Sequence, residues 1–148
     1  MYKQLTKSLQ RGISLLEIML SLSIVAIILV MATRYFFVAS TNQNMNKVRT
    51  QISAINSAVA QFRNNNSGST AVTMKVLVDG GYYPNSSDFD GTDLKSSFGG
   101  DITLSGTAGD YKIVTTLPSA ALCSRLTSNG KGSCADAVFT FDSNEATS

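Results

Sequence analysis

Apolar residues are concentrated in one uninterrupted run near the start of the chain. Residues 13–33 read ISLLEIMLSLSIVAIILVMAT and carry a single formal charge, Glu17. At a rise of about 1.5 Å per residue, a helix of 21 residues spans about 31 Å, close to the hydrocarbon thickness of a bilayer. The run therefore predicts a transmembrane helix.

A second apolar pattern follows this run with helical spacing. Six apolar residues recur at intervals of three or four positions, and no Gly or Pro interrupts residues 13–63. The six are Met45, Val48, Ile52, Ile55, Val59 and Phe62. They predict one helix over 13–63 whose second half is amphipathic. Because the stripe is shorter than the three to four heptads typical of a coiled coil, we favour packing on a sheet of the same chain over a coiled-coil seam.

The last 85 residues of the chain are polar and rich in Gly, Ser, Thr and Asp. Three segments here alternate apolar with polar residues, or gather β-branched and aromatic residues, which predicts β-strands. These segments are residues 101–105, 111–116 and 137–141. Residues 106–110 suit a hairpin turn between the first two. Such a small sheet needs an apolar cover, and the stripe of the long helix supplies one, so the pattern predicts an α+β fold.

Two shorter segments complete the predicted elements. Residues 74–78 form a helix or a strand that glycines at positions 80 and 81 end. Residues 118–126 form a short helix, with Pro118 near its start and Leu122 and Leu126 on one face. The polar part of the chain therefore combines strands with short helices.

Composition excludes several kinds of chemistry. The chain has no His, which excludes a Ser-His-Asp triad, a His-ligated zinc site and a histidine pH switch. Two cysteines are too few for a zinc site with four sulfur ligands. A net charge of +2, with no Trp and no long basic run, gives no electrostatic footprint for nucleic acid. We therefore expect neither an enzyme nor a cofactor.

The residues before the apolar run are basic. Lys3, Lys7 and Arg11 stand without an acidic residue in the first 12 positions, which is typical of a segment that starts on the cytoplasmic side. A secretory signal peptide would have a shorter apolar region and a small-residue cleavage site directly after it. A permanent single-pass anchor fits the length of the run.

Glu17 is the residue that neither interpretation explains. A carboxylate within a transmembrane segment costs about 2.5–3.5 kcal/mol and indicates a function and a partner. A cut between Gly12 and Ile13 would create a cationic α-amine about one helical turn from Glu17. If this amine pairs with the carboxylate of a neighbouring copy, the cost of inserting Glu17 becomes a drive to assemble.

The segment from Arg11 to Glu17, followed by an apolar helix, resembles the class III signal peptide of type IV pilins and pseudopilins. The shared features are a short basic leader, a Gly before the cut, an apolar first residue, a Glu at the fifth position after the cut and an unbroken apolar run. The resemblance implies that a prepilin peptidase cuts after Gly12 and methylates Ile13. It also implies that Glu17 pairs with the N-terminus of a neighbour in a filament.

The resemblance further implies a pilin fold, a long helix packed on a small antiparallel sheet. Residues 1–12 would be the leader, 13–33 the transmembrane segment and later the filament core, and 64–148 a globular head. The implied partners are other copies in a helical homopolymer, the prepilin peptidase, an assembly ATPase with its inner-membrane platform, and an outer-membrane secretin. The precursor would lie in the bacterial inner membrane and the filament outside the cell.

Several functions stay open at this point. The filament would serve adhesion, motility, DNA uptake or secretion. Within the family, a minor pilin or a type II secretion pseudopilin is the alternative. From another class, the alternative is a membrane-anchored binding module that never polymerises.

Cys123 and Cys134 lie near the end of a domain that should be exported. A disulfide is the simplest interpretation; it would contribute about 3 kcal/mol by loop closure and join the short helix to the final strand. A redox-active pair is disfavoured because the spacing is not Cys-x-x-Cys. By resemblance, the two cysteines bound the D-region of pilins, in a pattern closest to the type IVb branch.

Asp88, Asp90 and Asp93 place three carboxylates in one loop. Oxygen ligands of this kind hold calcium in proteins, so the loop is a candidate calcium site. The spacing fails the EF-hand pattern, however, which makes a solvated acidic turn the default interpretation. We therefore expect no resident metal.

Overall fold

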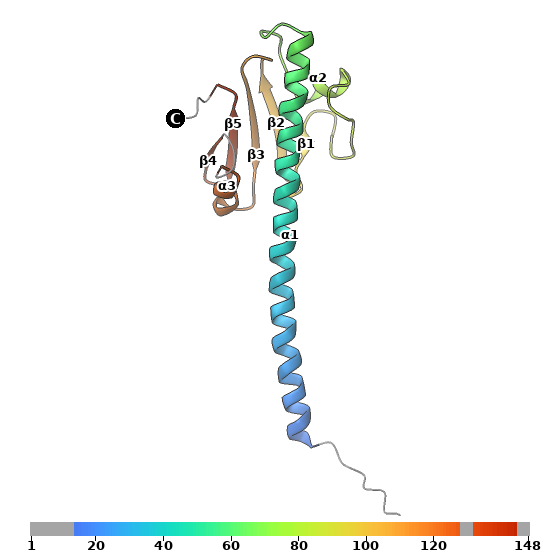
Figure 1. The fold of residues 1–148 in the computed structure, drawn as a ribbon, viewed down its shortest axis with the longest axis vertical. Helices are drawn as coiled ribbons and strands as arrows, with labels where there is room; N and C mark the ends of the chain where they lie inside the picture. Colours follow the sequence, from blue (N-terminus) through green and yellow to red (C-terminus); the bar gives the residue numbers. More distant parts are fainter. Residues whose placement is uncertain (1–13, 128–131, 145–148) are drawn as a thin grey trace, which may run out of the picture. The chain divides into compact units, whose positions relative to one another are not determined.

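Helix α1, Leu15–Asn65, is the longest element of the chain (Figure 1). The structure is a computed structural model that describes residues 14–127 and 132–144. The chain divides into two compact units, Met1–Ser40 and Thr41–Ser148, which we treat separately. The prediction of one uninterrupted helix is confirmed, with each end two positions further along the chain than in the expected range of 13–63.

The first unit consists, in its described part, of the apolar portion of α1. The helix begins after Ser14, whose carbonyl oxygen accepts the N–H groups of Glu17 at 2.9 Å and Ile18 at 3.2 Å. Further along, the hydroxyl groups of Ser23 and Thr33 donate to carbonyl oxygens four residues earlier. These bonds leave neither hydroxyl unsatisfied, so both residues suit an apolar environment.

The second half of α1 supplies one side of the hydrophobic core of the second unit. All six residues of the predicted stripe are buried, and Ala58 is buried with them. They form one cluster with apolar residues of the sheet, among them Ile102, Leu104, Ile113 and Phe139. The predicted packing on a sheet of the same chain is therefore confirmed for this half of the helix.

The sheet has five strands, all antiparallel, in the order β1-β2-β3-β5-β4. The strands are β1 Leu94–Lys95, β2 Asp101–Gly106, β3 Tyr111–Thr116, β4 Ser133–Ala135 and β5 Val138–Asp142. The three predicted strands correspond to β2, β3 and β5, which are adjacent in the sheet. The two edge strands, β1 and β4, were not predicted. On the outer side of β1, an isolated bridge joins Phe89 to Leu94.

The turn between β2 and β3 shows why glycine is needed there. Gly106 has a φ of +125°, and a Cβ atom at this position would lie 2.4 Å from the carbonyl oxygen of Asp110. Only glycine fits both constraints. The predicted hairpin over 106–110 is confirmed, since Gly106 and Tyr111 face each other in the register of β2 and β3.

Two short helices flank the sheet elements. Helix α2, Met74–Asp79, is capped by Thr73, whose hydroxyl oxygen accepts the N–H of Val76 at 3.3 Å. This cap settles the predicted helix-or-strand choice for 74–78 in favour of a helix. Helix α3, Ala120–Thr127, buries Cys123 and Leu126 and keeps Leu122 half-buried.

A disulfide joins Cys123 to Cys134, whose Cα atoms are 5.9 Å apart. The predicted disulfide is therefore confirmed, but one detail of the prediction was wrong. Cys134 lies in β4 and not in the final strand, because β4 and β5 form a tight hairpin in which Cys134 faces Phe139. The disulfide thus ties α3 to the edge of the sheet.

Thr115, in the central strand β3, is a fully buried polar residue. Its hydroxyl oxygen has no hydrogen-bond partner within the described part of the chain. We expect Thr115→Val to raise the free energy of unfolding by about 1 kcal/mol, because an isosteric methyl group replaces an unsatisfied hydroxyl. Thermal or denaturant unfolding of the full-length protein would measure the change.

The matched control for this prediction is Thr116→Val, on the exposed face of the same strand. It should change the free energy of unfolding by no more than about 0.5 kcal/mol. A destabilised Thr115→Val variant would contradict the prediction, since it would mean that the hydroxyl makes a favourable bond.

Candidate functional site

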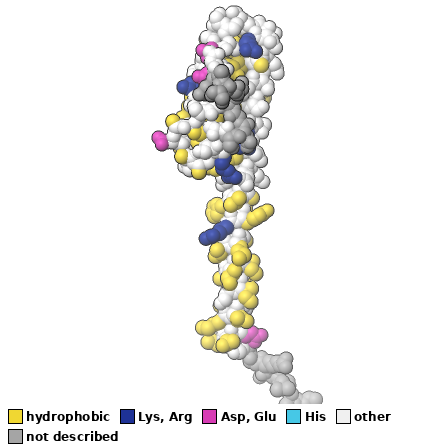
Figure 2. Space-filling model, turned by 60° about the vertical axis from the view of Figure 1, so that its left-hand side comes forward, with side chains coloured by type: hydrophobic (Ala, Val, Ile, Leu, Met, Phe, Trp, Pro, Cys, Tyr) yellow, Lys and Arg dark blue, Asp and Glu magenta, His cyan; other side chains and the backbone are white. Residues whose placement is uncertain are grey.

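The apolar side chains in the first part of α1 are not covered by the protein. Between Leu15 and Val38, the large hydrophobic residues are 47% to 79% exposed. Figure 2 shows hydrophobic side chains along this part of the helix. A soluble monomer rarely exposes an apolar surface of this extent, so lipid or other protein must cover it.

Helix α1 has the length and composition to cross a membrane, and none of its most apolar 18-residue window is buried. A helix that is hydrophobic around its whole circumference fits a membrane or the centre of an assembly. Further along α1, Arg34 and Tyr35 are followed by Phe36 and Phe37, whose rings meet edge to face at 6.3 Å. Basic and aromatic residues are enriched at membrane–water interfaces, a signal that the sequence analysis did not use.

Glu17 lies in the first turn of α1 and is exposed. A carboxylate in this turn is favoured by the positive end of the helix dipole. No Lys or Arg within residues 14–127 and 132–144 forms an ion pair with Glu17. Its predicted partner, the amine of Ile13 on another copy, and the predicted cleavage after Gly12 both involve positions outside the described residues. Among the described residues, Glu17 therefore has no ionic partner.

The three aspartates of the candidate calcium loop do not converge in the structure. Asp90 uses Oδ1 to accept the N–H groups of Asp93 at 2.9 Å and Thr92 at 3.0 Å. Its other oxygen, Oδ2, lies 3.4 Å from the ammonium group of Lys95. In the part of the chain that the structure describes, no group of three acidic, His or Cys residues is placed to hold a metal ion.

Electrostatics in this loop follow from the same contacts. The N–H groups of Asp93 and Thr92, helped by Lys95, hold the pKa of the Asp90 carboxyl below its usual value. Burial, and then the charge of Asp90, raise the pKa of Asp93. Lys95 also forms an ion pair with Asp101, and its pKa is raised by its bonds to these carboxylates, Asp101 first and then Asp90. Lys95 thus links Asp90 of the loop to Asp101 at the start of β2.

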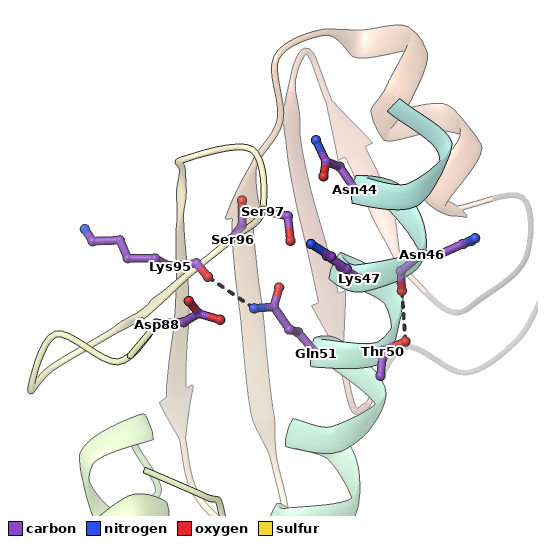
Figure 3. A pocket seen from close by; sticks show the side chains of 9 residues that line it. All are labelled: Asn44, Asn46, Lys47, Thr50, Gln51, Asp88, Lys95, Ser96 and Ser97. Atoms are coloured by element: carbon purple, nitrogen blue, oxygen red, sulfur yellow. Dashed lines mark hydrogen bonds between the residues drawn. The ribbon is translucent and has the colours of Figure 1, made fainter. Parts of the chain in front are cut away.

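A polar hollow lies between α1 and the segment that leads through β1 (Figure 3). Its volume is about 590 Å³. Side chains from both sides line it, including Asn44, Lys47, Gln51, Asp88, Ser96 and Ser97. Sequence reasoning did not detect this hollow, because no local pattern connects residues 44–51 with residues 88–97.

One comparison with known proteins gives a match. Residues 7–33 match the family model described as the prokaryotic N-terminal methylation motif. No curated protein and no solved structure matches the chain. The matched residues include the predicted cleavage position and Glu17, and the match supports a pilin-like family. The fold agrees with this, since a long N-terminal helix, a five-stranded antiparallel sheet and the Cys123–Cys134 disulfide form a pilin-like α+β arrangement.

Proposed function

We propose that this chain is the structural subunit of a type IV pilus, made as a membrane-anchored precursor and assembled through α1. One observation carries the proposal: the methylation motif over residues 7–33 overlaps the first part of α1, whose apolar side chains the chain itself leaves uncovered. A motif for N-terminal processing and a surface that requires a cover are thus found on the same element.

In this proposal the chain has three functional parts. A prepilin peptidase removes residues 1–12 by cutting after Gly12 and methylates the new N-terminus at Ile13. The helix over 13–63 serves first as anchor, through residues 13–33, and then as filament core. Residues 64–148 form the head, with the second half of α1 as part of its core. Removing the leader lowers the number of basic residues from 12 to 9 against 10 acidic residues, so the mature chain has a net charge near −1.

Assembly exchanges contacts with lipid for contacts with other copies of α1. Lipid tails are as apolar as these side chains, so the hydrophobic effect gives little net drive, and packing and polar contacts decide the association. Glu17 supplies such a contact when its carboxylate pairs with the Ile13 amine of a neighbour. The pair satisfies two charges that lie in an apolar environment. Because a copy in another axial register would leave both charges unpaired, the pair also fixes the register between copies.

The proposal places the precursor in the inner membrane and the filament outside the cell. An assembly ATPase with its membrane platform would extract the processed subunit, and a secretin would let the filament cross the outer membrane. The match to the methylation motif supports a pseudopilin as well, which is the second candidate. The disulfide at Cys123 and Cys134, which bounds the D-region by resemblance to pilins, favours the pilin.

Processing is tested by intact-mass analysis of the protein extracted from membranes of the producing bacterium. We expect a mass that lacks residues 1–12 and carries one additional methyl group. The control is Gly12→Leu, which should keep the full-length mass because the residue before the cut is altered. A wild-type protein that retains its leader would contradict pilin-like processing.

Assembly is tested by electron microscopy of material sheared from the cell surface, with antibody labelling of the head. Continuous labelling along filaments is expected for a major pilin, and labelling at rare points would instead indicate a minor pilin. Complete absence from sheared material, with the mature protein in the membrane, would contradict the pilus proposal.

A further inference from the structure

Four consecutive exposed side chains surround α1 where its apolar run ends. They are Arg34, Tyr35, Phe36 and Phe37, and we call them the collar. The three aromatic residues are 69% to 79% exposed, and Arg34 is exposed as well. Successive residues of an α-helix lie about 100° apart around its axis, so the collar covers the whole circumference. A protein that packs on one face of α1 would contact only part of the collar, whereas a lipid interface would surround all of it.

The collar also marks the change from apolar to polar sequence. Before it, residues 18–33 carry no charge, and soon after it residues 40–44 are all polar. Arg, Tyr and Phe combine an apolar body with a polar end or a ring, and residues of this kind suit the level of lipid headgroups. Among the residues that the structure describes, no carboxylate forms an ion pair with Arg34. A lipid phosphate is therefore a suitable partner for its guanidinium group.

The distance from the collar to Glu17 is shorter than the hydrocarbon layer of a bilayer. Arg34 follows Glu17 by 17 positions, which corresponds to about 25 Å along a helix. The hydrocarbon layer is about 30 Å thick, and a tilt of the helix would only shorten the distance that it spans. Glu17 and Arg34 therefore cannot both lie at the boundaries. If Arg34 is held at one boundary, Glu17 lies about 5 Å inside the other.

We propose that lipid headgroups of the periplasmic leaflet hold the collar and thereby set the depth of the precursor in the inner membrane. Arg34 bonds to a lipid phosphate, and the hydroxyl of Tyr35 bonds to a headgroup. The rings of Phe36 and Phe37 lie at the edge of the hydrocarbon. At this depth Glu17 stays within the hydrocarbon layer, so the collar preserves its drive to pair with a neighbouring copy. The inference rests on the proposed function, because it requires α1 to span the membrane before assembly.

Tryptophan fluorescence can measure the depth of the collar, because the chain contains no Trp. Phe36→Trp and Val25→Trp place single probes at exposed positions in the collar and near the middle of the span. The full-length protein would be reconstituted in vesicles of phosphatidylethanolamine and phosphatidylglycerol with brominated lipid in both leaflets. Bromine near the headgroup should quench Phe36→Trp at least about twofold more than bromine near the end of the acyl chain. Val25→Trp should show the opposite preference.

A second experiment tests whether the collar sets the depth of the helix. Without the collar, α1 should move by about 5 Å toward the side of its N-terminus, until the Glu17 carboxylate reaches headgroups. Leu20→Trp, about 9 Å from the nearer boundary when the collar is held, then becomes shallower. Its quenching by bromine near the headgroup should about double. The substitutions that remove the collar are Arg34→Gln, Tyr35→Leu, Phe36→Leu and Phe37→Leu.

Controls separate the chemistry of the collar from the effects of substitution. Arg34→Lys combined with Phe36→Tyr keeps a cation and an aromatic ring, and it should leave the quenching of Leu20→Trp unchanged. Ser57→Trp, at an exposed position in the second half of α1, should not be quenched by either lipid. Circular dichroism would establish that each variant keeps its helix.

Two results would overturn the proposal for the collar and leave the pilus proposal intact. One is a Phe36→Trp probe that prefers deep bromine or escapes quenching, although Val25→Trp is quenched. The other is unchanged quenching of Leu20→Trp after the collar is removed. If Val25→Trp also escaped quenching, α1 would not be inserted, and the membrane-anchored precursor would be contradicted together with the collar.

Discussion

Glu17→Ala is expected to lower the yield of sheared surface filaments by about 100-fold or more. Under the proposed pairing, the substitution leaves the Ile13 amine of the neighbouring copy as an unpaired charge in an apolar environment, which costs about 3–5 kcal/mol per contact. The amount of protein in the membrane should not fall, because removing the carboxylate eases insertion by about 2.5–3.5 kcal/mol. Immunoblots of the sheared and membrane fractions, with electron microscopy of the sheared fraction, measure both effects.

The matched control for this prediction is Ser23→Ala. Ser23 lies on the same exposed part of α1, and its hydroxyl bonds to the carbonyl oxygen of Met19 in its own helix. Losing this local bond should leave filament yield near that of the wild type. Intact-mass analysis would establish that Glu17→Ala is still cut after Gly12. Wild-type filament yield from a processed Glu17→Ala protein would refute the pairing.

Replacing both cysteines with alanine is expected to lower the free energy of unfolding by about 3 kcal/mol, the loop-closure contribution of a short disulfide loop. For a unit of this size, the melting temperature should fall by about 10–20 °C. The effect should be large because the disulfide attaches α3 to β4, an edge strand of three residues. Thermal unfolding of the oxidised wild type and the double variant measures the difference.

Two controls make this result interpretable. Reduction of the wild type should produce a similar loss of stability, whereas Ser133→Ala, next to Cys134 on an exposed position of the same strand, should not. A loss below about 1 kcal/mol in the double variant would contradict the predicted contribution.

Periodicity predicted the long helix and its packing. The six apolar residues from Met45 to Phe62 recur with helical spacing, and all six are buried in the structure. The same reasoning predicted β2, β3 and β5, because each has five or six residues in which alternation or β-branching can be recognised. Long elements with one buried face can therefore be predicted from the periodicity of the sequence.

The edge strands left no such pattern. β1 has two residues and β4 has three, too few for an alternation of apolar and polar side chains. β4 also lacks a β-branched or aromatic residue. Both strands exist because they pair with longer neighbours, β2 and β5, so their formation depends on contacts that only the folded chain provides.

The two candidate sites differ in the same way. Glu17 is conspicuous in the sequence because it is the single charge in an apolar run. The hollow beside Gln51 was not predicted, because its polar residues resemble ordinary surface residues until the fold brings the segment at 88–97 against α1. A hollow is a property of three-dimensional surroundings, and no residue type indicates it.

The brevity of β1 and β4 has a consequence for the proposed filament. A long, unpaired edge strand recruits further strands through its backbone, which is the route to amyloid. Here one edge offers two residues, already bridged by Phe89 and bearing the charged Lys95, and the other offers three. In the proposed filament, side chains and not main-chain ladders would therefore hold the subunits together. Fibre diffraction from the filament should lack the cross-β repeat of about 4.7 Å. Growth of the filament should then depend on the assembly machinery that supplies new subunits.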